Sequence, residues 1–145
     1  MDAAPLRLQL ANDLSALEPT RLALLDYLLP HGPSARAVYA VELVLEEVLS
    51  NQVKYAFNSS DAAGARPEPL IEFSAWTEAG TVMLKFVDSG VAFDPLQAEA
   101  PVPPTSIDVA PVGGLGVVLV RKFAASASYQ RRDDRNCLTI GVALA

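Results

Sequence analysis

The sequence predicts an α+β fold, a two-layer sandwich in which a mixed, mostly antiparallel sheet is covered on one face by helices. Two stretches with helical periodicity lie near the N-terminus, and four of the five strand-like stretches follow as two hairpins. Of the 145 residues, 51% are hydrophobic, which is enough for one core. We therefore expect residues 1–145 to form a single domain.

The N-terminal part is predicted to hold one strand and two helices. Apolar and polar residues alternate over Leu6–Ala11, as in a half-buried strand. A helical pattern over residues 15–32 ends in a proline and a glycine. A second helix is expected over residues 34–57, with Ser34 as its N-cap. Its apolar stripe repeats at spacings of three and four and consists of Val38, Val41, Leu45 and Val48.

The remaining strands are predicted as two antiparallel hairpins. Residues 58–69 read as a loop, and residues 70–76 and 81–88 as strands joined by a tight turn at "TEAG". Residues 126–132 and 136–144 form the second pair around "DDRN".

A long segment without periodicity separates the two hairpins. Residues 94–112 contain five prolines, and loops of this length in a small domain are generally functional or linkers. We expect residues 95–112 to act as a lid. A helix is predicted to open near Gly114.

Composition and charge exclude several classes. The net charge of −6 argues against a nucleic-acid-binding surface, which needs clustered Lys and Arg. The apolar runs are too short to span a bilayer, and the N-terminus lacks the pattern of a secretory signal. The single cysteine, Cys137, suits the cytosol. We therefore expect a cytoplasmic protein without membrane or nucleic-acid partners.

Glu47, Asn51 and Lys54 form the first candidate constellation. Spacings of four and three place them on one stripe of the second helix, beside its apolar face. A carboxylate and an amide one turn apart can hold a hard cation such as Mg²⁺ through oxygen. The alternative is a solvated polar edge of an amphipathic helix.

Asp88 and Gly90 form the second constellation, in "VDSGVAFDP". Asp88 stands where an apolar strand ends, and a carboxylate fixed there can accept a hydrogen bond from an exocyclic amine. The alternative is an ordinary strand-to-loop turn, for which Asp-Ser-Gly is typical.

The third constellation is "GGLG", residues 113–116, at the predicted opening of a helix. Backbone N–H groups at a helix N-terminus suit phosphate. The stretch lacks the pattern of a P-loop and has no preceding strand for a dinucleotide fingerprint. The alternative is a close helix–sheet crossing that requires small residues.

Taken in order, "EEVLSNQVKYAF", "DSGVAFDP", a long loop and "GGLG" resemble the nucleotide boxes of the Bergerat-fold, histidine kinase-like ATPases. The short chain, the "DxGxxFDP" and "GGLGVxLV" forms and the closing "NxLTI" strand are most similar to the anti-sigma factor serine/threonine kinases. The resemblance covers nearly the whole chain.

The resemblance implies roles at the phosphate end of an ATP site. Glu47 would be the general base, Asn51 the Mg²⁺ ligand, and Lys54 a neighbour of the phosphates. Backbone N–H groups facing the phosphates would come from Gly114, Leu115 and Gly116. Many members carry an arginine just before the glycine pair, whereas "DVAPVGG" contains no basic residue.

At the base end, the resemblance makes Asp88 the acceptor of the adenine amino group and Gly90 the residue that leaves room for the ring. Ala92 stands where the family commonly has glycine, and Tyr55 where it usually has histidine. Thr139 would join the adenine hydrogen-bond network through water.

The implied function is an ATP-dependent protein serine/threonine kinase that also acts as a binding switch. It would phosphorylate a STAS-type anti-sigma antagonist and bind a sigma factor or another regulator, with a homodimer as a further possibility. One alternative is a nucleotide-dependent binding module without transfer, which the missing arginine favours and the presence of Glu47 and Asn51 opposes. A detached histidine-kinase ATPase domain is opposed by His31, which stands at a helix stop.

Overall fold

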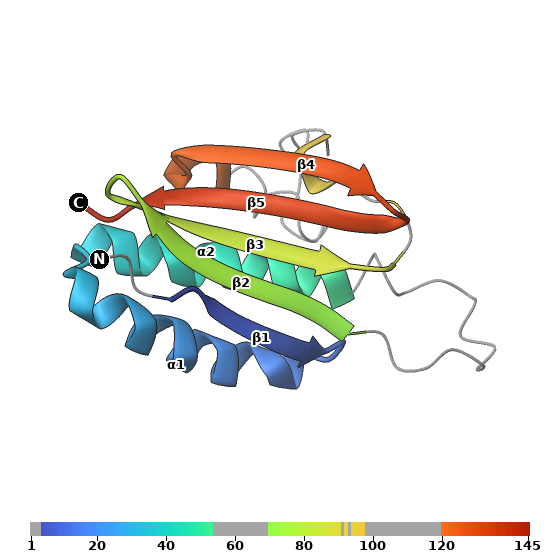
Figure 1. Ribbon diagram of the computed structural model, residues 1–145, viewed down its shortest axis with the longest axis horizontal. Coiled ribbons are helices and arrows are strands. Elements are labelled where there is room, and N and C mark those ends of the chain that lie inside the picture. The colour runs from blue at the N-terminus through green and yellow to red at the C-terminus, as the bar shows by residue number, and fades with distance from the viewer. Residues whose placement is uncertain (1–3, 54–69, 91, 93, 98–119) are drawn as a thin grey trace, which may run out of the picture.

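One five-stranded antiparallel sheet forms the frame of the molecule (Figure 1). The structure is a computed structural model that describes residues 4–53, 70–90, 92, 94–97 and 120–145. Its strands are β1 (Leu6–Ala11), β2 (Leu70–Glu78), β3 (Thr81–Asp88), β4 (Ser126–Arg132) and β5 (Arg135–Ala143). Their order is β1-β2-β3-β5-β4, and all four pairings are antiparallel. The predicted fold class is confirmed, and the described sheet is uniform where a mixed one was expected.

Both hairpins turn through residues with positive φ. Ala79 and Gly80 have φ of 47° and 79°, and Asp133 and Asp134 have φ of 54° and 61°. Left-handed pairs of this kind match the right-handed twist of the flanking strands. Asp tolerates this region better than most residues, which fits the hairpin prediction at "DDRN".

The first predicted helix is divided into three parts. Helix α1 (Leu17–Leu28) is flanked by the 3₁₀ turns η1 (Leu14–Ala16) and η2 (Leu29–His31). Gly32 ends it in the left-handed region, with φ of 60°. The prediction of one helix over residues 15–32 therefore had the right extent, while the tighter turns at its ends follow from local hydrogen bonding.

Helix α2 (Ala35–Asn51) begins as predicted, because the Ser34 Oγ accepts a hydrogen bond from the Ala37 N–H at 3.0 Å. Its regular part ends earlier than residue 57: Gln52 and Val53 form a wider turn, and residues 54–57 lie outside the described residues. Among the described helices, none has both the length and the hydropathy that crossing a bilayer requires.

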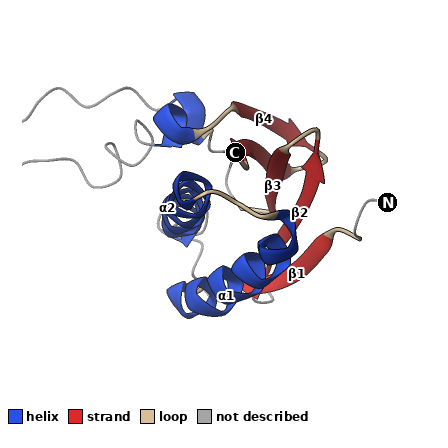
Figure 2. Cartoon of the chain, turned by 90° about the vertical axis from the view of Figure 1, so that its left-hand side faces the viewer, coloured by secondary structure: helices blue, strands red, loops and turns tan. Residues whose placement is uncertain are grey.

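The core lies between the sheet and the two helices, which cover the same face (Figure 2). Side chains alternate along β3, so that Val82, Leu84 and Phe86 are fully buried. The Phe86 ring packs against that of Phe73 with centroids 5.1 Å apart. Burial of each such large apolar side chain contributes about 1.5–3 kcal/mol to the stability of the fold. The strands that carry the polar residues at the edge of this layer are therefore held in place.

Strand register and packing bring four elements together at one end of the sheet. Asp88, the last residue of β3, pairs with Asn136 near the start of β5. The C-terminal turn of α2 lies over the same end (Figure 1). A 3₁₀ turn, η5 (Pro95–Gln97), contacts β4 beside this end of the sheet. Residues of β3, β5, α2 and η5 therefore meet there.

The helical residues 120–123 are anchored to the opposite end of α2. The Phe123 ring meets that of Tyr39 edge-on at 5.3 Å, and the Arg36 guanidinium lies 4.8 Å from its centroid. Val120 joins the main core. Residues 120–123 are thus fixed against the helix layer.

Candidate functional site

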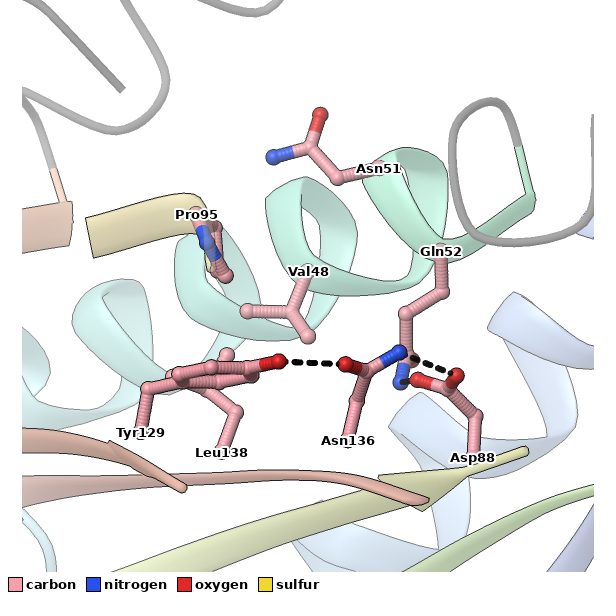
Figure 3. Close-up of a pocket in the computed structure, with 8 residues that line it drawn as sticks. All are labelled: Val48, Asn51, Gln52, Asp88, Pro95, Tyr129, Asn136 and Leu138. Carbon is pink, nitrogen blue, oxygen red and sulfur yellow. Dashed lines mark hydrogen bonds between the residues drawn. The ribbon is translucent and has the colours of Figure 1, made fainter. Parts of the chain in front are cut away.

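A small cavity lies between the last turn of α2 and the ends of β3, β4 and β5 (Figure 3). Its volume is about 20 Å³, room for one or two water molecules. One wall is apolar and the other carries polar side chains. The described lining residues are Val48, Asn51, Gln52, Asp88, Pro95, Tyr129, Asn136 and Leu138.

Asp88 is the central acceptor of this cavity. The residue is only 3% exposed, and three N–H groups from different parts of the chain point at its carboxylate. The Gln52 Nε2 donates to Oδ2 at 2.7 Å, while the Asn136 Nδ2 and the Gly90 N–H both donate to Oδ1 at 2.9 Å. Because hydrogen bonds to a charged group contribute about 1.5–3 kcal/mol each, this carboxylate is fixed in place.

A chain of hydrogen bonds extends from Asp88 to β4. The Tyr129 hydroxyl donates to the Asn136 Oδ1 (Figure 3). This bond orients the Asn136 amide so that its Nδ2 faces Asp88. From the same strand, the Arg131 Nη1 donates to the Gly90 carbonyl oxygen at 2.8 Å and holds the turn after β3. The base of the cavity is therefore positioned from three strands.

Helix α2 directs two neighbouring amides differently. Gln52 extends down to Asp88, whereas Asn51 points away from it (Figure 3). Asn51 is 7% exposed and lines the cavity on the far side. Glu47 lies one turn earlier on α2 and is half-buried. The predicted spacing thus places Glu47 one turn before Asn51 on the same helix, and of the two only Asn51 is among the described residues that line the cavity.

The other predicted residues are placed as follows. Gly90 is buried against Asp88, and Ala92 is exposed. Thr139 pairs with Lys85 and Ser128, on the sheet face opposite to that of Asn136 and Leu138. This placement separates Thr139 from the other described site residues. Lys54, Gly114, Leu115, Gly116 and residues 98–112 of the expected lid lie outside the described residues.

Three polar residues of the site were missed by the sequence analysis: Gln52, Tyr129 and Asn136. Two left a signal. Gln52 follows Val48 by four residues, so it is a polar side chain where the apolar stripe of the helix should continue. Asn136 is the polar member of an alternating inward set that continues with Leu138 and Ile140. Tyr129 left no such signal. The other residues of β4 are exposed, so no inward-facing apolar pattern marks its position.

The arrangement favours recognition of a ligand with N–H donors. Asp88 offers a rigid acceptor, and Val48 and Leu138 offer apolar surface for a flat ring. The described residues contain no cluster of three or more acidic, His or Cys side chains that would hold a metal alone. Mg²⁺ commonly binds through one or two protein oxygens together with phosphates and water, and the Asn51 amide fits that need.

A family model described as "Histidine kinase-like ATPase domain" matches residues 10–142 of the chain. The match includes α1, α2 and every described residue that lines the cavity.

One curated relative and one solved structure also match the chain. A protein named serine/threonine-protein kinase BtrW, from Bordetella bronchiseptica, is 37% identical over 107 residues, which are 74% of this chain and 71% of that protein. The crystal structure of the RsbU and RsbW domains of a Mycobacterium tuberculosis protein matches with a TM-score of 0.65 and 15% identity. That match covers 98% of this chain but 33% of the other, so the chain spans about a third of that protein and the likeness concerns the fold.

Proposed function

The chain belongs to the histidine kinase-like ATPase domain family, and on that premise we propose that it is an ATP-dependent protein serine/threonine kinase of the anti-sigma factor branch. The observation that carries the proposal is Asp88, a buried acceptor at a cavity that Asn51 also lines. The name of the Bordetella relative supports the same activity.

In this proposal Asp88 recognises the adenine base, and Glu47 acts in phosphoryl transfer. Asp88 accepts the exocyclic amine of adenine, with Asn136 and Gly90 holding the carboxylate in position. Glu47 takes the proton from the hydroxyl of a partner serine or threonine as its oxygen attacks the γ-phosphorus. The bond to the β-phosphate oxygen breaks, and ADP leaves.

The phosphates require a cation, and Asn51 is its proposed ligand. The side chain is neutral, oxygen-bearing and nearly buried. Mg²⁺ supplies charge neutralisation for the transferring phosphoryl group when bound. Lys54 and the backbone of residues 114–116 remain proposed phosphate contacts, and residues 95–112 a proposed lid.

The proposed substrate is a STAS-type anti-sigma antagonist, and phosphorylation would change which regulator the kinase binds. A sigma factor is the proposed alternate partner, and a homodimer the proposed assembly. We place the activity in the cytoplasm, in line with the single cysteine, Cys137.

A second candidate function is a nucleotide-dependent binding module that transfers no phosphate. It is favoured by the absence of a basic residue from "DVAPVGG", since an arginine near the terminal phosphate can raise the rate by about 10³ or more.

One assay separates the two functions. The full chain is incubated with γ-labelled ATP, Mg²⁺ and a co-encoded STAS protein. The kinase proposal expects label on a serine or threonine of the partner, and no label in EDTA. A related active kinase that labels its own partner protein serves as the control. If the chain binds ATP but labels no partner while the control does, the binding module is the correct function.

A further inference from the structure

Gln52 occupies an acceptor position on Asp88 that an adenine amine would use. Its Nε2 lies 2.7 Å from the Asp88 Oδ2, and the residue is 8% exposed. The orientation of the amide is determined by chemistry, because a carboxylate accepts and only the amide nitrogen can donate to it. A side chain of the protein therefore supplies the same kind of donor as the proposed ligand.

The other end of the Gln52 amide is poorly satisfied. Its Oε1 is buried without a hydrogen-bond partner among the described residues. A buried acceptor in this state is unfavourable, because it has lost its water without a replacement. The Gln52 amide therefore gains a hydrogen bond at its nitrogen and loses one at its oxygen. Moving the side chain into water would let the oxygen form a hydrogen bond, which lowers the free-energy cost of that movement.

The cavity beside Gln52 is small. Its volume of about 20 Å³ holds one or two water molecules, and a purine is several times larger. Asp88 itself is 3% exposed, so its remaining lone pair cannot be approached while Gln52 covers it. A ring amine that donates to the Asp88 Oδ2 from this side would therefore take the place of the Gln52 amide.

Gln52 is held less firmly than Asn136, the other amide that donates to Asp88. Asn136 is bonded at both ends of its amide, to Tyr129 and to Asp88, and its backbone is in the sheet. Gln52 is bonded to Asp88 through one end of its amide and leaves the helix at its C-cap, where the regular hydrogen-bond pattern of α2 stops.

We propose that Gln52 is an internal competitor for the adenine amine, and that it sets both the affinity and the selectivity of the site. This inference rests on the proposed function. Adenine binding exchanges one N–H donor on the Asp88 Oδ2 for another, and the Gln52 amide moves out to water. Selectivity follows because only a donor can replace a donor: guanine presents a carbonyl oxygen at that position.

The test compares Mg·ATP binding by the wild-type chain, Gln52→Ala and Gln52→Met, using calorimetry. Alanine removes both bulk and donor, while methionine keeps the length but cannot donate to Asp88. Both variants are expected to bind ATP about three- to ten-fold more tightly than wild type, since neither competes for the acceptor. Melting curves establish that each variant is folded, and the methionine variant serves if alanine does not fold.

A direct readout is the side-chain amide signal of Gln52 in ¹⁵N–¹H NMR spectra, assigned by its absence in Gln52→Ala. Mg·ATP should move it to the position of a solvated amide, and GTP should leave it unchanged. Equal or weaker ATP binding by both variants, or a signal unmoved by ATP, would overturn the exchange. Tighter binding by alanine alone would also overturn it, because space and not the donor would be limiting. If neither wild type nor variants bind ATP, the proposed function fails together with the exchange.

Discussion

Two carboxylates of the proposed site, Asp88 and Glu47, differ in what surrounds them. Asp88 ends a core strand, is almost fully buried and accepts three N–H groups. Glu47 lies on the edge of α2 and keeps part of its surface in solvent. A carboxylate held by several buried donors is a fixed acceptor, suited to recognition. One that is partly exposed leaves room for a substrate hydroxyl to approach, which is what a general base requires.

The largest effect is expected from Glu47→Gln. The substitution preserves size and hydrogen bonding but removes the proton acceptor, so transfer to a partner serine should fall by about 10²–10⁴. ATP affinity should change little. The measurement is the initial rate of partner labelling at saturating ATP.

The matched control is Glu46→Gln, which makes the same change one residue earlier, at an exposed position on the same helix. Its rate should equal that of wild type. If Glu46→Gln slows transfer and Glu47→Gln does not, the general base is Glu46 and not Glu47.

Asp88→Asn tests the recognition half of the comparison. An amide in place of the carboxylate turns an –NH₂ group toward buried donors from Gln52, Asn136 or Gly90. Unfolding free energy should fall by about 1–3 kcal/mol, and ATP affinity by about ten-fold or more. Denaturant melts and calorimetry measure the two quantities. Unchanged ATP affinity in a folded variant would remove Asp88 from the adenine site.

A smaller effect is expected one step further out. Tyr129→Phe removes the hydroxyl that orients the Asn136 amide, while the ring still covers the cavity. We expect a loss of about 1 kcal/mol in stability and a two- to three-fold loss in ATP affinity, in line with about one hydrogen bond. A larger change in affinity than in stability would mean that Tyr129 contacts the ligand itself.

The smallest effect is expected at Glu18, a carboxylate without burial. Its hydrogen bonds to Arg21, at 2.9 Å and 2.5 Å, are the main cause that holds the Glu18 pKa below its ordinary value. A depressed pKa in the folded state stabilises the protein above the unfolded value, and this contribution disappears as the pH falls through the folded one. Because the pair is exposed, salt screens it.

Glu18→Gln should therefore lower the melting temperature slightly at neutral pH and low salt. The difference from wild type should vanish in 1 M salt and below the ordinary range of glutamate pKa values. A difference that persists at low pH would mean that Glu18 acts through packing and not through charge.

Local patterns were enough to predict the strands and the N-cap at Ser34. Each of these depends on neighbours within a few residues, such as the alternation along β3 or the hydrogen bond from Ser34 to Ala37. The same holds for Glu47 and Asn51, whose spacing on a helix places both on one edge.

Only the tertiary structure decided which groups meet at Asp88. Gln52 and Asn136 are 36 and 48 residues away from it in sequence. Strand register brings Asn136 opposite Asp88, and the same register turns Thr139 to the other face of the sheet. A side chain's face alternates with every residue of a strand, so one step of register changes which groups line a site. Sequence patterns predict the elements here, whereas the contacts at Asp88 depend on how those elements pack.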